Sequence, residues 1–310
     1  MTFELTILGS SSAIPTSKRN LTAHVLNVHE RFFLIDCGEG TQIQIRKNKI
    51  KFGKINHIFI SHLHGDHIFG LFGLISTFNL LNRDKDLHIY AHPELEKFLA
   101  HHIEYFEKTL SFNLIYHHIK PKVNEVIYED DKVTIETIPL KHRVPTCGFK
   151  FTEKPHLFNL KKNVVQTYQI PISKIQSIKE GADFINEEGE VIPNHKLTLP
   201  PYKSRSYAYC TDTAYSEKIV PIIQNVDLLF HEATFAKNMK DQAKKTFHST
   251  SEDAANIAQQ ANAGKLILGH FSARYKDAQP IVNEARSIFE QTSEAEDGNK
   301  YSVDLEREKR

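Results

Sequence analysis

Four side chains of metal-binding type lie within six consecutive residues of this 310-residue chain. His62, His64, Asp66 and His67 follow Ile55–Ile60, an apolar run that is typical of a buried strand. Imidazoles at i and i+2 of an extended segment project to one side. Zinc prefers imidazole nitrogen and carboxylate oxygen, and paired metal ions catalyse hydrolysis by activating water. The spacing therefore predicts a two-metal hydrolytic centre, with a histidine-rich surface turn as the alternative.

Three further candidate ligands each follow a predicted strand. They are His142 after Lys132–Ile138, Asp212 after Ser206–Cys210, and His270 after Leu266–Leu268. Each residue taken alone is typical of a structural or solvated position. Open α/β sheets, however, place their chemistry beyond the carboxyl ends of strands. Together with the first cluster, these residues would complete two metal sites.

The elements that must position these residues alternate between strands and helices, which predicts an α/β fold. Strands are expected at Phe3–Leu8, Arg31–Ile35, Ile55–Ile60, Lys132–Ile138, Ser206–Cys210, Val226–Phe230 and Leu266–Leu268, and helices at Ile68–Leu81, Pro93–Leu110 and Ser251–Ala261. The segment from Lys154 to Lys179 contains no Asp or Glu, which indicates an insertion. The charged tail after Gln291 is expected to be disordered.

Composition narrows the class of protein. The formal net charge is +1, so any nucleic-acid surface must be a local patch. The three cysteines are widely spaced, which argues against a disulfide framework and fits a reducing compartment. No run approaches the roughly 20 apolar residues of a membrane span, and the N-terminus lacks the pattern of a signal peptide. We expect a cytoplasmic enzyme with no membrane association.

Several further motifs run along most of the chain, from Leu8 to Tyr275. They are LGSSSAIP at 8–15, DCGEGTQ at 36–42, SHLHGDHIFGL at 61–71, HRVPTCGF at 142–149, TDT at 211–213, HEATF at 231–235, HST at 248–250 and GHFSARY at 269–275. With these motifs the chain resembles the metallo-β-lactamase superfamily and, within it, the ribonuclease Z family. The resemblance implies a single αββα sandwich domain over residues 1–310, with two mixed sheets face to face, helices outside, an inserted exosite arm at about 152–203 and a charged tail at about 292–310.

The resemblance also implies ligands and catalytic roles. One zinc ion would be held by His62, His64 and His142, and a second by Asp66, His67 and His270, with Asp212 bridging the two; manganese is a possible substitute. Asp66 would orient the nucleophile, and His248, held by Glu232, would protonate the leaving oxygen. Asp36 would orient a ligand histidine, or it is a turn residue at the end of a strand.

The implied reaction cuts precursor tRNA on the 3′ side of the discriminator nucleotide and leaves a 3′-hydroxyl and a 5′-phosphate. Arg19 and Asn20 match the loop that positions the acceptor end, although Lys18 sits one place later than in the family pattern. Lys161, Lys162 and Lys174 would bind the tRNA body from the arm, which lacks the usual Gly-Pro hinge; a solvated loop is the alternative. The family also implies a homodimer.

Two other functions stay open at this stage. The first is another metallo-β-lactamase-fold enzyme, a phosphodiesterase or a small-ester hydrolase, which the ligand pattern alone would also fit. The lysine-bearing insertion argues against it, because an enzyme without a tRNA substrate does not need such an insertion. A catalytically inactive RNA-binding module would have lost one or more ligands, and the sequence lacks none of them.

Overall fold

The computed structural model describes residues 1–309, which form two compact units. The first contains residues 1–152 and 206–303, and the second contains residues 153–205 together with the C-terminal segment from 304. Among the described residues, no helix is long and apolar enough to cross a membrane.

Two seven-stranded mixed sheets form the first unit. The first sheet has the order β20 (Lys300–Ser302), β1 (Phe3–Gly9), β3 (Ala23–Val28), β4 (Arg31–Ile35), β5 (Ile55–Phe59), β6 (Leu87–Ala91) and β7 (Leu114–His118). The second has the order β19 (Thr292–Glu294), β17 (Lys265–Gly269), β16 (Leu228–Glu232), β15 (Ser206–Cys210), β10 (Cys147–Glu153), β9 (Val133–Pro139) and β8 (Val126–Glu129). Each sheet contains a set of parallel strands that leads to candidate residues. The set is β4, β5, β6 and β7 in the first sheet and β15, β16, β17 and β19 in the second.

Apolar side chains from both sheets share the central core. Phe33 and Phe59 of the first sheet and Phe149, Phe151 and Tyr207 of the second are fully buried in one cluster. Aromatic rings cross between the layers, as Phe33 and Phe151 do with centroids 5.6 Å apart. Burial of such large side chains is the main favourable contribution to this packing.

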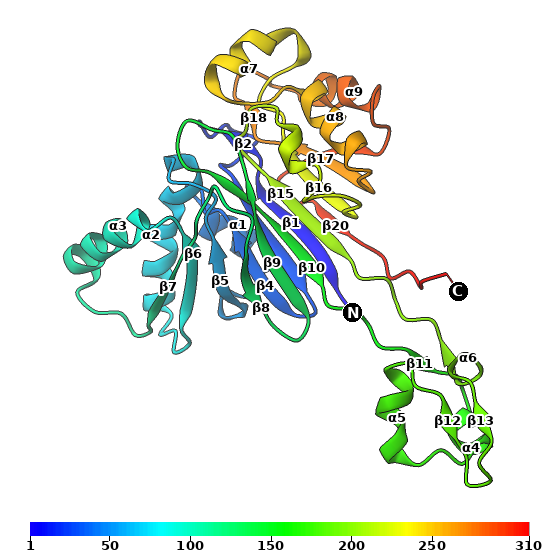
Figure 1. Ribbon diagram of the computed structural model, residues 1–310. Helices are drawn as coiled ribbons and strands as arrows, with labels where there is room; N and C mark the ends of the chain where they lie inside the picture. Colours follow the sequence, from blue (N-terminus) through cyan, green and yellow to red (C-terminus); the bar gives the residue numbers. More distant parts are fainter. Residues whose placement is uncertain (310) are drawn as a thin grey trace. The chain divides into compact units, whose positions relative to one another are not determined.

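Helices cover the two outer faces (Figure 1). One outer cluster joins α1 (Thr41–Lys47), α2 (Gly65–Leu80) and α3 (Glu94–His102) to the first sheet. The other joins α8 (Ser251–Gln260) and α9 (Gln279–Arg286) to the second sheet, with α7 (Lys240–Thr246) preceding them. The order helix, sheet, sheet, helix confirms the predicted αββα sandwich.

The second unit has its own small core of Val164, Ile170, Ile178, Phe184, Ile192 and Leu197. Its elements are β11 (Asn159–Leu160), α4 (Val164–Thr167), α5 (Ile172–Lys179), β12 (Phe184–Ile185), β13 (Val191–Ile192), α6 (Asn194–Leu197) and β14 (Thr198–Leu199). Two short antiparallel pairings hold it together: β11 with β14, which joins the two ends of the unit, and the hairpin of β12 with β13. The C-terminal segment adds a bridge from Arg307 to Tyr202.

Two sequence expectations differ from the structure. The helix expected over Pro93–Leu110 is α-helical only over Glu94–His102 and continues as a π-helix, Ile103–Glu107. It ends there because Lys108 has a positive φ of 61°, which a helix cannot continue through. The tail from 292 was expected to be disordered, but it contributes β19 and β20. These strands are short and polar, as edge strands usually are, so their sequence shows little of the apolar alternation that marks a strand.

Helix α2 approaches the loop after β4 closely. A Cβ placed on Gly70 would lie 2.0 Å from the carbonyl oxygen of Gly38, whereas a Cβ on Gly73 would meet only the side chain of Gln42. The Gly70 amide also donates to the Cys37 carbonyl at 2.9 Å. Glycine at position 70 therefore fixes the distance between α2 and this loop.

We expect Gly70→Ala to lower the free energy of unfolding by about 1–3 kcal/mol, because backbone must move to admit the methyl group. Gly73→Ala is the matched control: Gln42 can rotate away, and alanine improves helix propensity by up to about 1 kcal/mol. Thermal melting of the two variants measures this difference. Equal melting temperatures would show that the close approach does not constrain the fold.

Candidate metal centre

All seven predicted ligands lie beyond the strand ends at one edge of the first unit. His62 and His64 belong to the loop between β5 and α2, and Asp66 and His67 lie in the first turn of α2. The other three follow strands of the second sheet, namely His142 after β9, Asp212 after β15 and His270 after β17. The structure thus brings together residues that are up to 208 positions apart (270 minus 62).

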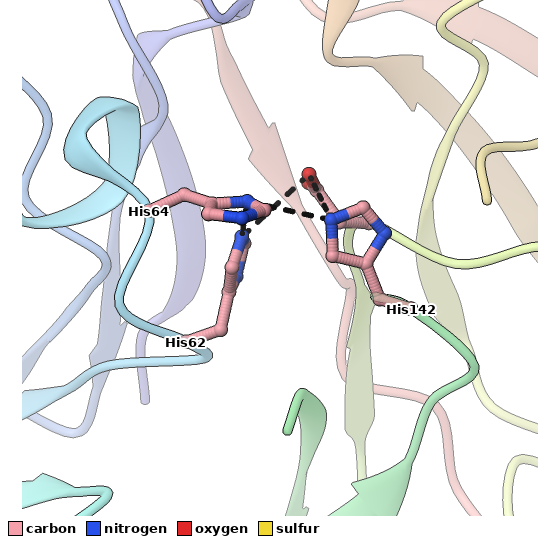
Figure 2. A group of neighbouring side chains, drawn as sticks. His62, His64 and His142 are labelled. Carbon is pink, nitrogen blue, oxygen red and sulfur yellow. Dashed lines mark hydrogen bonds and ion pairs between the residues drawn. The ribbon is translucent and has the colours of Figure 1, made fainter. Parts of the chain in front are cut away.

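Three imidazole nitrogens form a first group with one oxygen of Asp212. His62 Nε2 lies 3.0 Å from His64 Nδ1, and His142 Nε2 lies 3.4 Å from the same nitrogen. Asp212 Oδ2 is 3.6 Å from His62 Nε2 and 3.7 Å from His142 Nε2. Figure 2 shows the three imidazoles turned toward one another. These atoms are close enough to hold one metal ion.

The other oxygen of Asp212 faces a second group. Asp212 Oδ1 lies 3.3 Å from His67 Nε2 and 3.1 Å from His270 Nε2. Asp66 Oδ2 lies 3.5 Å from each of these two nitrogens. One carboxylate therefore offers a separate oxygen to each group, which is the arrangement a bridging ligand requires.

The chemistry of these atoms fits a metal cation. The Nε2 atoms of His67 and His270 are buried and have no hydrogen-bond partner, and a buried polar atom without a partner costs about 1–3 kcal/mol. Burial lowers the pKa of His62 well below its usual value, so its ring is neutral, which is the form that coordinates metal. A cation would satisfy the free nitrogens and the carboxylate oxygens together.

Hydrogen bonds from the fold set the tautomers of the histidines. Asp36 Oδ2 lies 2.7 Å from His67 Nδ1, so this nitrogen carries the proton and Nε2 is left for a cation. Asp36 also accepts from Ser61 Oγ at 2.8 Å and from Tyr209 OH at 2.6 Å. Because the Ser61 hydroxyl donates to Asp36, it accepts from His62 Nδ1 at 3.0 Å. Asp36 therefore orients two histidines rather than only closing a turn.

His142 and His270 are oriented by hydrogen bonds to the segment between β16 and α8. His142 Nδ1 lies 2.9 Å from the Phe247 carbonyl. His270 Nδ1 lies 3.0 Å from Thr234 Oγ1, and the Thr234 hydroxyl donates to Glu232 at 2.6 Å. In both histidines the Nδ1 proton is used and Nε2 faces the ligand group. Backbone strain accompanies this placement, because Asp36 (φ 56°) and His270 (φ 57°) are in the left-handed region.

His248 and Glu232 form a pair beside the metal groups. His248 Nδ1 lies 2.8 Å from Glu232 Oε1, and Glu232 is fully buried. Burial opposes the charged form of His248, but Glu232 and, more weakly, Asp212 outweigh it and raise the pKa of His248 to about 9. An imidazole in this environment keeps a proton near neutral pH and can donate it.

A cavity of about 830 Å³ opens over these residues. His64, Asp66, His142, Asp212 and His248 line it, so candidate ligands and the candidate acid face the same space. Its walls also carry Phe69, Arg143 and Arg274, to which the sequence analysis gave no role. Phe69 is 61% exposed and offers an aromatic face to a ligand.

The predicted substrate-binding residues lie elsewhere. Arg19 is buried and its guanidinium donates to the Tyr275 carbonyl, and Asn20 Nδ2 donates to Asp297 at 2.8 Å. Neither lines the cavity, although Ile14 and Pro15 of the same loop do, and their role in substrate binding stays a prediction. The three arm lysines belong to the second unit: Lys162 and Lys174 are exposed, and Lys161 donates to the His195 carbonyl at 2.8 Å.

Several residues that orient the ligands could not be assigned from the sequence. Ser61 and Thr234 sit inside quoted motifs, so their positions carried a signal although their partners did not. Tyr209 and the Phe247 carbonyl carried none, because their contacts exist only once the two sheets are packed together. Cys37 and Cys147 are buried, and burial raises the pKa of the Cys37 thiol to about 12.

This sandwich, with histidines and aspartates gathered at one edge, defines a hydrolase of the metallo-β-lactamase superfamily. One of two matching family models carries the name of this superfamily. A model for the Beta-lactamase superfamily domain matches residues 196–271, and a model for Anti-Pycsar protein Apyc1 matches residues 3–176.

Comparison with whole proteins narrows the class further. Ribonuclease Z of Bacteroides thetaiotaomicron is 51% identical over 94% of this chain and 92% of its own length. Ribonuclease Z of Porphyromonas gingivalis W83 is 44% identical over 98% and 99% of the two chains. The crystal structure of human tRNase Z, short form, superposes with a TM-score of 0.71 at 26% identity, over 97% and 99% of the chains. The chain therefore belongs to the ribonuclease Z family.

Since Asp36 orients His67 and, through Ser61, His62, we expect Asp36→Asn to weaken metal binding by about 10–100-fold. Competition with a chromogenic chelator measures this affinity. Asp36 accepts hydrogen bonds from both the amide and the hydroxyl of Ser61. Asp227→Asn is the matched control, because Asp227 accepts the same two hydrogen bonds from Ser206, away from the ligands. If both variants bound metal as tightly as the unaltered protein, Asp36 would have no part in the centre.

Proposed function

We propose that this protein is a zinc-dependent endoribonuclease that cuts precursor tRNA on the 3′ side of the discriminator nucleotide, leaving a tRNA 3′-hydroxyl and a trailer with a 5′-phosphate. The observation that carries this proposal is the His248–Glu232 pair, which faces the same cavity as the two metal-ligand groups. Membership of the ribonuclease Z family supports the choice of RNA as substrate.

In this proposal His62, His64 and His142 would hold one zinc ion, Asp66, His67 and His270 would hold a second, and Asp212 would offer one carboxylate oxygen to each group. When bound, paired zinc ions lower the pKa of water toward neutrality and offset negative charge on the phosphoryl group. Manganese has affinity for the same nitrogen and oxygen ligands and is a possible substitute.

The chain's own residues carry the rest of the reaction. Asp66 lines the cavity, and its carboxylate accepts a hydrogen bond from the Ala13 amide at 2.8 Å. This contact fixes the carboxylate where it can orient a water nucleophile. His248 donates a proton to the 3′-oxygen that leaves the phosphorus. Glu232 accepts a hydrogen bond from the Nδ1–H of His248, which leaves the other ring nitrogen to carry the proton toward the leaving group.

The arm and the assembly extend this proposal. Lys162 and Lys174 of the second unit are exposed and would contact tRNA phosphates, with Lys161 beside them. The exposed aromatic side chains of Phe98, Tyr105 and Phe106 suit association with a second copy of the chain. Electrophoretic shift of tRNA at several salt concentrations tests the contact with the lysines, and analytical ultracentrifugation tests the association of two copies.

The three buried, unpaired cysteines support a cytoplasmic location.

A second candidate is a metallo-β-lactamase-fold enzyme that hydrolyses small phosphodiesters. Residues 3–176 match a family model other than ribonuclease Z, and paired metal ions at the two ligand groups would activate water toward a small phosphodiester as well as toward RNA. The ratio of catalytic efficiency on precursor tRNA to that on bis(p-nitrophenyl) phosphate separates the two. A ratio near one would favour the small-substrate enzyme.

We expect His248→Ala to lower the turnover of precursor tRNA by about 10²–10⁴-fold with unchanged zinc content, because it removes the proton donor and no ligand. His118→Ala is the control, since His118 also pairs with a glutamate, Glu96, at 2.7 Å but lies on an exposed strand end. Gel analysis of cleavage under single-turnover conditions gives both rates. Near-normal turnover by the His248 variant would exclude it as the general acid.

A further inference from the structure

A run of cations begins at the end of α1, the short helix that starts at the rim of the catalytic cavity, and continues into the loop after it. Glu39 lines the cavity, and α1 begins two residues later and extends for seven residues, or about 10 Å. The cations lie on the last turn of α1 and on the loop to β5. They are Arg46, Lys47, Lys49, Lys51 and Lys54, and all five are exposed.

Two hollows lie beside this run. One of about 390 Å³ and one of about 280 Å³ share the lining residues Glu30, Phe32, Lys51 and Lys54. Lys85 extends the first hollow, and Lys49 extends the second. We refer to the two hollows and the five cations together as the α1 basic groove.

The acidic neighbours do not neutralise this groove. Glu30 lies 3.7 Å from Lys54, and Glu4 is taken by Lys300 at 2.8 Å. Within residues 1–309, Arg46, Lys47, Lys49 and Lys51 form no ion pair. These four cations lie within residues 46–51 of a chain whose net charge is only +1, so the positive field is local.

Aromatic rings lie between these charges. The guanidinium of Arg46 stands 5.4 Å from the centroid of the Phe52 ring, and Phe32 lines both hollows. Grooves that combine cations along a path with aromatic side chains bind single-stranded nucleic acid through its phosphates and bases. A protein partner with an acidic surface would have no need of the rings.

We propose that the α1 basic groove binds the single-stranded 3′ trailer of the precursor RNA. This inference rests on the proposed function and adds a substrate contact outside the catalytic cavity. The path is set by the chain itself: Glu39 at the cavity rim, the length of α1, then the cations. A trailer that leaves the cavity on the α1 side would meet phosphate-binding lysines after a few nucleotides.

The test uses the triple variant Lys47→Gln, Lys49→Gln, Lys51→Gln on two precursors, one with a trailer of about 2 nucleotides and one of about 20, longer than the roughly 4–16 that such grooves cover. We expect KM to rise about tenfold for the long trailer and to stay within about twofold for the short one. The slope of log affinity against log salt for a free single-stranded RNA should fall by about 2, since each phosphate contact contributes about 0.7.

The matched control removes the same charge elsewhere, with Lys120→Gln, Lys122→Gln and Lys218→Gln, three exposed lysines that line neither hollow. Equal losses on both trailers would show that the groove grips the tRNA body, and no loss on either would show that it does not contact RNA. Both results would overturn the proposal. The affinity for free RNA needs no cleavage, so it separates failure of the groove from failure of the proposed function.

Discussion

One buried carboxylate organises this molecule. Asp212 presents Oδ2 to His62 and His142 and Oδ1 to His67 and His270, all within 3.1–3.7 Å. Burial raises the pKa of Asp212, but His270, His67 and His62 outweigh it and hold the pKa well below its usual value, so the group stays ionised. A buried charge is tolerated only when it is paired, and here the partners are the atoms that a metal centre needs.

The sandwich explains how this carboxylate meets its partners. Parallel strands of both sheets end at the same edge, so the loops after β5 and β15 face each other although they are about 150 residues apart. Asp36 then joins the two layers, because it accepts hydrogen bonds from Ser61 in the loop after β5 and from Tyr209 in β15 of the second sheet. Gly70 sets α2 against the same loop. The positions of the candidate ligands therefore depend on the same contacts that pack the two sheets and α2 together.

The sequence carried much of this arrangement. Ligand types with fixed spacing predicted the candidate metal ligands, which the fold brings together, and short apolar runs predicted the strands that position them. The polar edge strands β19 and β20 were missed, because pairing with β17 and β1 rather than residue pattern makes them strands. The roles of Tyr209 and of the Phe247 carbonyl were missed because these contacts are long-range. Arg19 was assigned to substrate from its motif, and its burial against Tyr275 is visible only in the fold.

The central proposal is that the ligand groups around Asp212 would hold two zinc ions and that the nuclease activity depends on them. The most direct test is titration of the metal-free protein with zinc while the cleavage rate of a precursor tRNA and the ends of its products are followed. The account predicts that activity rises to a break at about two equivalents per chain and yields a tRNA 3′-hydroxyl. Full activity without zinc, or a break at one equivalent, would contradict it.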